Sequence, residues 1–167
     1  MKRYVLLPIV VLVAAALLAA APAPKKNNPD FDRMKSLVGE WAGKSDGGNS
    51  VTVSYKLVSS GTALMETLDP SGEYEMVSLY HPDGDRLMMT HYCAAGNQPR
   101  MRSAKSSGDS KTISFSYVDA TNLSGPSEGH MIGLDITFED ADHFAQKWNW
   151  TGEPPSKPEV FHFQRKK

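Results

Sequence analysis

The sequence predicts an all-β protein: a single antiparallel up-and-down β-barrel of about ten strands, with a short N-terminal helix closing one end. Two patterns carry this prediction. Apolar and polar residues alternate with period two through most of the chain after residue 39, and turn-forming residues recur at short intervals. Residues 30–167 are also enough for one domain with its own core.

The N-terminus has the three-part layout of a secretory signal peptide. Lys2 and Arg3 are followed by an apolar run over residues 5–21 that ends in small alanines. We therefore expect a signal peptide at 1–21, a linker at 22–29 and the barrel domain at 30–167. This predicts export to the periplasm or the extracellular space, with no stable membrane span after cleavage. An uncleaved anchor is the alternative, because the run is close to the ~20 residues that cross a bilayer.

Charge and cysteine content narrow the class further. The formal net charge is −1, which gives no electrostatic basis for binding nucleic acid. The single cysteine cannot form an internal disulfide, so the domain must be held together by a packed core. The sequence leaves the oligomeric state open.

One short helix is expected before the first strand. Asp30, just after Pro29, is the predicted N-cap, and Phe31, Met34 and Val38 recur at helical spacing. Gly39 then stands where a helix ends.

The remaining residues read as strands and turns. Alternation is clearest over residues 51–57, 112–117 and 132–138, and it gives each strand one buried and one wet face. The ten strands are expected near residues 40–45, 50–58, 62–68, 74–81, 85–93, 99–105, 111–118, 130–139, 142–151 and 159–166. Hairpin links favour an up-and-down barrel, which leaves no exposed edge strand. Residues 119–129 form a longer polar loop.

Gly39-Glu40-Trp41, placed after a short helix, resembles the Gly-x-Trp start of lipocalin-like (calycin) barrels. The resemblance implies a structural pair, in which Arg165 near the end of the last strand packs over the ring of Trp41. Such a contact contributes ~0.5–2 kcal/mol. The nearest likeness is to uncharacterised exported bacterial members, which brings no function with it.

The chain departs from several relatives of this class. A true lipocalin has eight strands, whereas ten strands are more similar to fatty-acid-binding proteins or nitrobindin-type haem barrels. The helical lid of fatty-acid-binding proteins is missing, because Gly47-Gly48-Asn49 joins the first two strands tightly. Their Arg-x-Tyr carboxylate clamp is also absent.

The strand at 85–93 carries the most distinctive residues. Leu87, Met89, His91 and Cys93 share one face, and its apolar start predicts that this face points inward. His91 and the only cysteine would then look into the barrel near one mouth.

Glu66 and His130 are further polar residues at expected inward positions, the latter beginning the set Ile132, Leu134, Ile136 and Phe138. With His91 and Cys93 they could converge on a metal. Hydrogen-bonded interior polar groups are the commoner outcome. A haem would need an axial histidine, for which His91, His130 and His162 qualify by residue type.

Catalysis by Cys93 would need a base within hydrogen-bond reach, and His91 is about 7 Å along the same strand. His130 from another strand would have to supply that base. A buried cysteine acting as a small apolar residue is more usual.

Arg100 and Arg102 share the face opposite Met101. Facing inward they would bind a ligand carboxylate or phosphate, and facing outward they would be solvated charges. The apolar Met101 favours the outward arrangement.

The sequence therefore predicts binding of a small, partly apolar or amphipathic ligand inside the barrel. The candidate ligand-binding residues are His91, Arg102, Tyr117, Asn122, His130 and Trp148. Two alternatives remain: a haem- or metal-dependent enzyme or sensor using His91, Cys93 and His130, and a structural envelope protein with a filled barrel. No catalytic residue and no cofactor is assigned by the sequence.

Overall fold

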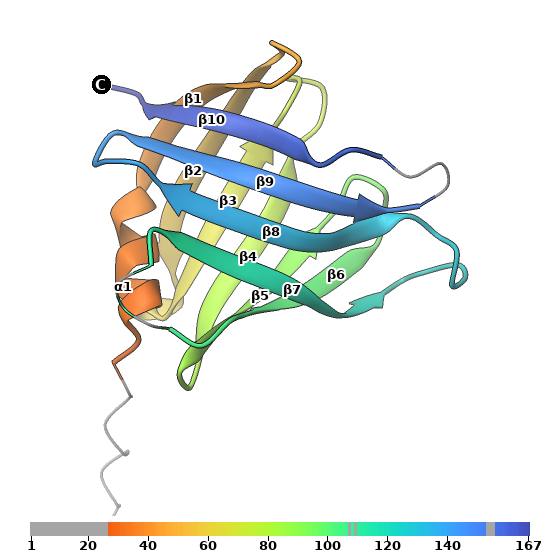
Figure 1. The fold of residues 1–167 in the computed structure, drawn as a ribbon, viewed down its shortest axis with the longest axis horizontal. Coiled ribbons are helices and arrows are strands. Elements are labelled where there is room, and N and C mark those ends of the chain that lie inside the picture. Colours follow the sequence, from red (N-terminus) through yellow and green to blue (C-terminus); the bar gives the residue numbers. More distant parts are fainter. Residues whose placement is uncertain (1–26, 107, 109, 153–155) are drawn as a thin grey trace, which may run out of the picture.

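A computed structural model describes residues 27–106, 108, 110–152 and 156–167, and within them the chain forms a closed barrel of ten antiparallel strands (Figure 1). The strands are β1 (Gly39–Ser45), β2 (Ser50–Val58), β3 (Ala63–Asp69), β4 (Met76–Asp83), β5 (Arg86–Tyr92), β6 (Gln98–Ser103), β7 (Thr112–Thr121), β8 (His130–Phe138), β9 (His143–Thr151) and β10 (Glu159–Arg165). Consecutive strands pair with each other, and β1 pairs with β10 to close the ring. The predicted fold class is confirmed. The predicted signal peptide lies outside the described residues.

A short helix, α1 (Pro29–Met34), and the 3-10 turn η1 (Lys35–Leu37) lie across one end of the barrel (Figure 1, left). The predicted cap was wrong. Asn28, and not Asp30, accepts a hydrogen bond from the Phe31 N–H at 2.9 Å, and Pro29 takes the first helical position. Asn28 is itself buried.

The apolar face of this segment also differs from the prediction at its end. Phe31 and Met34 are buried as expected, whereas Val38 is 41% exposed and Leu37 is buried in its place. The change of helical pitch in η1 causes this shift, because a 3-10 turn rotates the chain further per residue than an α-helix does. Within the described ranges, no helix is long and apolar enough to span a membrane.

Two strand ends and the register of one strand differ from the sequence prediction. β5 ends at Tyr92, so Cys93 belongs to the following turn. β7 continues to Thr121, beyond the expected end at 118. A register shift between Met131 and Gly133 turns Ile132 outward, although strict alternation predicts it inside.

The end covered by α1 is held by the pair that the lipocalin-like resemblance implied. The Arg165 guanidinium lies 4.0 Å from the centroid of the Trp41 ring, and Trp41 is almost completely buried. Arg165 also donates hydrogen bonds to the carbonyl oxygens of Ser36 and Val38. These contacts join the last strand to the segment between η1 and β1.

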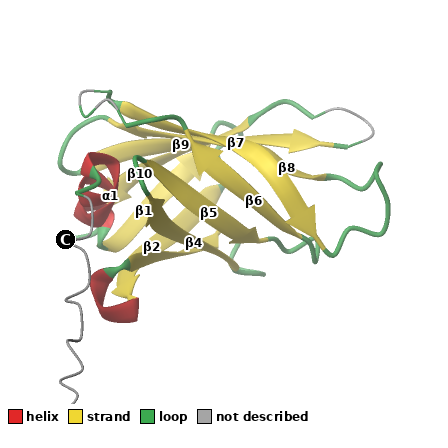
Figure 2. Cartoon of the chain, turned by 90° about the horizontal axis from the view of Figure 1, so that it is seen from below, coloured by secondary structure: helices red, strands yellow, loops and turns green. Residues whose placement is uncertain are grey.

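The two ends of the barrel differ. α1 lies at one end, together with the small helical turn η2 (Ser59–Gly61), as the view from below shows (Figure 2). At the other end, the described chain consists of strand ends and loops, including the turn after β5 and the loop between β7 and β8. Large apolar side chains such as Met34, Trp41, Leu64, Met89 and Phe144 fill the interior towards the helix end and the middle. These side chains occupy the interior there, which leaves the uncovered mouth as the place to look for a site inside the barrel.

Candidate ligand site at the barrel mouth

A buried carboxyl group occupies the middle of the barrel. Glu66 of β3 is inaccessible to solvent, and Tyr55 and Tyr80 donate their hydroxyl hydrogens to its Oε2 atom at 2.6 and 3.0 Å. Ser78 donates to the Oε1 atom at 3.3 Å. Burial raises the pKa of this carboxyl, and the hydrogen bonds that it accepts act in the opposite direction.

β9 adds two side chains to this network. The Gln146 amide nitrogen lies 2.7 Å from both the Tyr55 hydroxyl and Glu66 Oε2, and Trp148 donates its indole N–H to Gln146 Oε1 at 3.0 Å. All of these groups are buried. The network therefore crosses the interior from β2 and β3 to β9 and fixes the side chains that it connects.

His91 joins the network through Ser78. Its Nδ1 atom lies 3.0 Å from Ser78 Oγ, and its ring centroid lies 4.7 Å from that of Trp148. The Nε2 atom is buried and has no hydrogen-bond partner among the described residues. Burial lowers the pKa of His91 to about 4, so the ring is neutral near pH 7.

A cavity of about 370 Å³ lies at this mouth, and His91 and Trp148 belong to its wall. Much of the remaining lining is apolar or aromatic and includes Leu68, Tyr74, Met76, Met131, Trp150 and Phe161. Cys93, half-buried and unbridged, lies at the same wall. The cavity thus combines apolar walls with one buried histidine, which is the composition typical of small-molecule sites.

A second hollow, of about 880 Å³, lies beside α1. Its walls include Phe31 of α1, the Gly61–Ala63 region and the outward side chains Leu79 and His81 of β4. It therefore lies outside the barrel. None of the buried polar atoms left without a partner in the described residues belongs to its lining.

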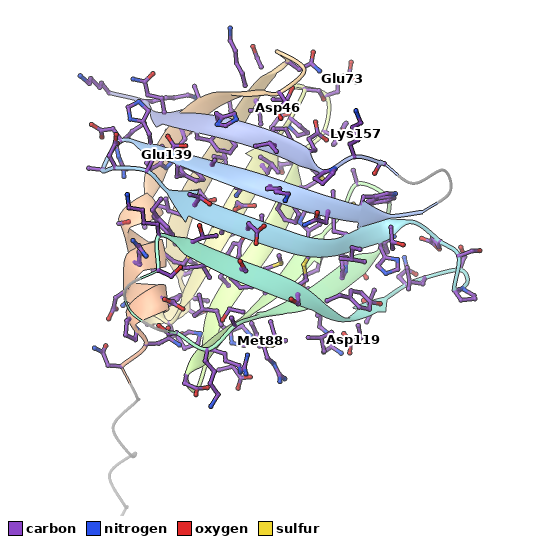
Figure 3. The ribbon with its side chains drawn as sticks, viewed as in Figure 1. Asp46, Glu73, Met88, Asp119, Glu139 and Lys157 are labelled. Carbon is purple, nitrogen blue, oxygen red and sulfur yellow. The ribbon has the colours of Figure 1, made fainter. Side chains whose placement is uncertain are left out.

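Two of the six predicted ligand residues, His91 and Trp148, line the mouth cavity. Arg102 does not: it lies on the outer face, where its Nε atom contacts Met88 Sδ at 3.3 Å and lies 3.7 Å from Asp83. Arg100 is also outside and pairs with Asp119 at 2.5 Å. Figure 3 shows Met88 and Asp119 at the outer surface of the barrel.

The other three predicted residues form a separate group beside the loop that follows β7. His130 is buried, and its Nδ1 atom lies 2.8 Å from the Glu128 carbonyl oxygen. Its ring packs on Tyr117 at 4.9 Å between centroids. Asn122 is exposed and donates to the Gly96 carbonyl at 2.6 Å. These contacts hold loops together, and none of the three side chains reaches the cavity wall.

The described residues contain no group of three or more His, Cys, Asp and Glu side chains close enough to hold a metal ion. The convergence of Glu66, His91, Cys93 and His130 that a metal site would need is therefore not formed among these residues. His162 lies on the outer face, 3.3 Å from Asp46. Of the three histidines considered for haem, only His91 lines the cavity.

The sequence indicates Glu66 as an inward polar residue but does not indicate the network around it. Tyr55 and Gln146 stand at inward positions of their strands, where a hydroxyl and an amide must find partners. That parity was the available signal. It could not show that β2, β4 and β9 direct their polar side chains to the one carboxyl on β3.

The site and fold define this chain as a closed ten-stranded barrel with a partly filled interior and a cavity at one mouth. The structure is similar to the crystal structure of Rv2717c from M. tuberculosis, with a TM-score of 0.59 and 13% sequence identity. The match covers 85% of this chain and all of that one. At this identity the likeness concerns the fold alone. No protein-family model and no curated protein matches the sequence.

Proposed function

We propose that this chain is an exported protein that binds a small, partly apolar ligand in the mouth cavity. The observation that carries the proposal is a cavity with aromatic walls that His91 also lines, a buried side chain whose Nε2 atom has no hydrogen-bond partner among the described residues. Export rests on residues 1–21, and a shortened N-terminus in the mass of the periplasmic or secreted protein would support it.

The cavity suits a compact ligand. Its volume of about 370 Å³ is at the lower end of the ~300–1,000 Å³ usual for small-molecule pockets. Each Å² of apolar ligand surface removed from water contributes about 25 cal/mol, before the cost of ordering the ligand is subtracted. Apolar burial would provide affinity, and the few polar groups would set the ligand's orientation.

A matched pair of variants tests whether this cavity is the site. Ala94 is an exposed residue of the cavity wall, and Ala104 is an exposed residue after β6, at the other end of the barrel. The uncharged dye N-phenyl-1-naphthylamine should bind the wild type with increased fluorescence. Ala94→Trp should weaken binding at least about tenfold, because the indole occupies cavity volume, while Ala104→Trp should bind as the wild type does.

Equal dye binding by all three proteins would place the dye elsewhere and contradict the proposal. Absence of dye binding by the folded wild type, and of any small molecule retained in native mass spectrometry, would instead favour a structural envelope protein.

A haem- or metal-binding protein is the second candidate, and the unpartnered His91 Nε2 atom favours it. His91 would be the axial ligand, since His130 and His162 lie away from the cavity. A bound haem would supply redox or gas-binding chemistry. The visible spectrum and metal content of the purified protein decide this candidate: a Soret band that disappears in His91→Ala would support it, and a colourless, metal-free protein would contradict it.

A further inference from the structure

The hydrogen directions in the buried network can be assigned from one end. The Trp148 indole is a donor only, so the Gln146 atom that faces it must be the carbonyl oxygen. The Gln146 NH2 group therefore faces Tyr55 and Glu66, at 2.7 Å from each acceptor. This removes the usual ambiguity between amide oxygen and nitrogen.

The directions of the tyrosine hydroxyl hydrogens follow from this orientation of Gln146. Because the Tyr55 oxygen accepts from Gln146, its own hydrogen is directed to Glu66 Oε2, 2.6 Å away. Tyr80 donates to the same oxygen at 3.0 Å. Three donors on one oxygen are what a carboxylate needs inside a barrel, because each partly replaces the water that it has lost.

Ser78 connects this carboxylate to His91. Its single hydroxyl hydrogen can go to Glu66 Oε1 or to His91 Nδ1. When Glu66 is ionised, a hydrogen bond to its carboxylate is stronger than one to a neutral ring, so the Ser78 hydrogen goes to Glu66. Ser78 Oγ must then accept from a protonated Nδ1.

The opposite assignment, in which Ser78 donates its hydrogen to His91 Nδ1, would cost free energy. It would leave Glu66 Oε1 without this donor, and it would place an N–H on His91 Nε2, which has no acceptor among the described residues. With Nδ1 protonated, Nε2 instead carries a lone pair. That atom lies across the ring from Ser78, on a side chain that lines the cavity.

The rest of the lining limits the charge of the ligand. No Lys or Arg is among the described lining residues, and Glu159 lies at the rim. An anionic ligand would therefore lack a counter-charge. The aromatic rings of Trp148 and Trp150 favour a flat body that can pack against them.

We propose that His91 presents an acceptor nitrogen to the cavity, and that the ligand class is a flat, apolar and uncharged molecule with one hydrogen-bond donor: a phenol, an aromatic alcohol or an N–H heterocycle. Ser78 and Glu66 are positioning residues that fix the ring's tautomer. This inference rests on the proposed function, because it names the ligand chemistry of the same cavity.

Two probes of nearly the same shape test the preference. 2-Naphthol carries the donor, whereas 2-methylnaphthalene replaces its hydroxyl with a methyl group. The affinity ratio of 2-naphthol to 2-methylnaphthalene should fall about tenfold from wild type to His91→Phe, as expected for loss of one hydrogen bond. Ser78→Ala retains His91 and should lower the ratio in the same direction, which keeps the test available if His91→Phe does not fold.

Nitrogen-15 NMR of the histidine rings gives a readout independent of binding. In the wild type, His91 should show a protonated Nδ1 and an unprotonated Nε2, and this distinction should weaken in Ser78→Ala. A protonated Nε2 in the wild type would overturn the inference.

The binding outcomes separate the two proposals. If both probes bind in the cavity and the ratio is the same in wild type and His91→Phe, the ligand-class inference is wrong and the binding function stands. If neither probe nor N-phenyl-1-naphthylamine binds the folded wild type, both are wrong.

Discussion

At the scale of single residues, Glu66 shows how this barrel accommodates a carboxyl group in its interior. A buried charge without partners would cost far more than the folded state of a small domain can supply. Here Tyr55, Tyr80, Ser78 and Gln146 all donate to it. The cost is offset by this set of donors, and the same donors extend the network to His91.

His91 should make the stability of the protein depend on pH. Its folded pKa of about 4 lies below the ordinary value of 6.5, so the unfolded chain takes up a proton first as the pH falls. The contribution of the neutral His91 ring to the unfolding free energy is therefore fully present above about pH 6.5. It is lost as the pH falls towards 4. The full loss is about 3 kcal/mol, because a tenfold change in proton affinity between the folded and unfolded chain corresponds to about 1.4 kcal/mol.

Urea unfolding of the wild type and His91→Phe at several pH values measures this contribution. As the pH falls from 6.5 to 4, the unfolding free energy of the wild type should decrease relative to that of His91→Phe. Burial also raises the pKa of Glu66, but Glu66 is present in both proteins, so the difference between them reports on His91. A difference that does not change with pH would show that His91 is not held neutral.

The sequence predicted the inward or outward direction of only some side chains correctly. The alternation of β5 placed His91 inside, and the apolar Met101 correctly favoured an outward Arg102. Ile132 was misplaced, because a bulge in β8 adds one residue and reverses the parity beyond it. A bulge depends on how two strands meet, which period-two counting does not contain.

At the scale of elements, α1 is attached to the barrel through its cap. The Asn28 side-chain oxygen accepts from the Phe31 N–H, and its nitrogen donates to the carbonyl oxygens of Gly84 and Arg86 at 3.2 and 2.9 Å. One buried amide thus begins the helix and joins it to the turn between β4 and β5. The six-residue helix is too short to be stable alone, so these contacts determine where it lies.

Replacing Asn28 should loosen this end. Asn28→Ala removes the cap and both hydrogen bonds to the β4–β5 turn, and we expect it to lower the unfolding free energy by about 1–2 kcal/mol. Urea unfolding measures the loss, and hydrogen exchange of the α1 amides should become faster.

Asn27→Ala is the matched control, because Asn27 precedes the cap and is exposed. It should leave stability within about 0.5 kcal/mol of the wild type. Equal effects of the two substitutions would mean that the cap does not hold the helix to the barrel.

The sequence also suggested Asp30 as the cap, which is a reasonable inference from local pattern because Asp is a common N-cap. Asn28 takes that position because Pro29 fits the first helical position and because Gly84 and Arg86 offer carbonyl groups to the Asn28 amide. The second reason comes from residues more than fifty positions away, so no local pattern contains it.

At the scale of the whole molecule, closure depends on the pairing of β1 with β10. Trp41 and Arg165 stand opposite each other in this register, and the guanidinium covers the indole at the end near α1. Arg165 also donates to Ser36 and Val38 carbonyls, so one side chain joins the last strand to the chain before the first.

Arg165→Ala should therefore weaken the whole barrel rather than one strand. We expect a loss of about 2 kcal/mol in unfolding free energy, from the cation–π contact and the hydrogen bonds to carbonyl groups. Lys166→Ala removes a neighbouring exposed cation and is the control, with little expected change. Thermal unfolding of both variants measures the effect, and equal melting temperatures would contradict the closing role of Arg165.

By itself, the sequence determined the all-β class, the approximate bounds of ten strands, the helix near the N-terminus and the inward direction of Glu66, His91 and Trp148. These follow from local periodicity and turn chemistry, which act over a few residues. Only the tertiary structure decided that Glu66 gathers donors from β2, β4 and β9, that Arg102 and His130 lie away from the cavity, and that the cavity opens at the end opposite α1. The physical reason is that strand register and closure bring distant residues together, and a local pattern has no information about which distant residue will be the neighbour.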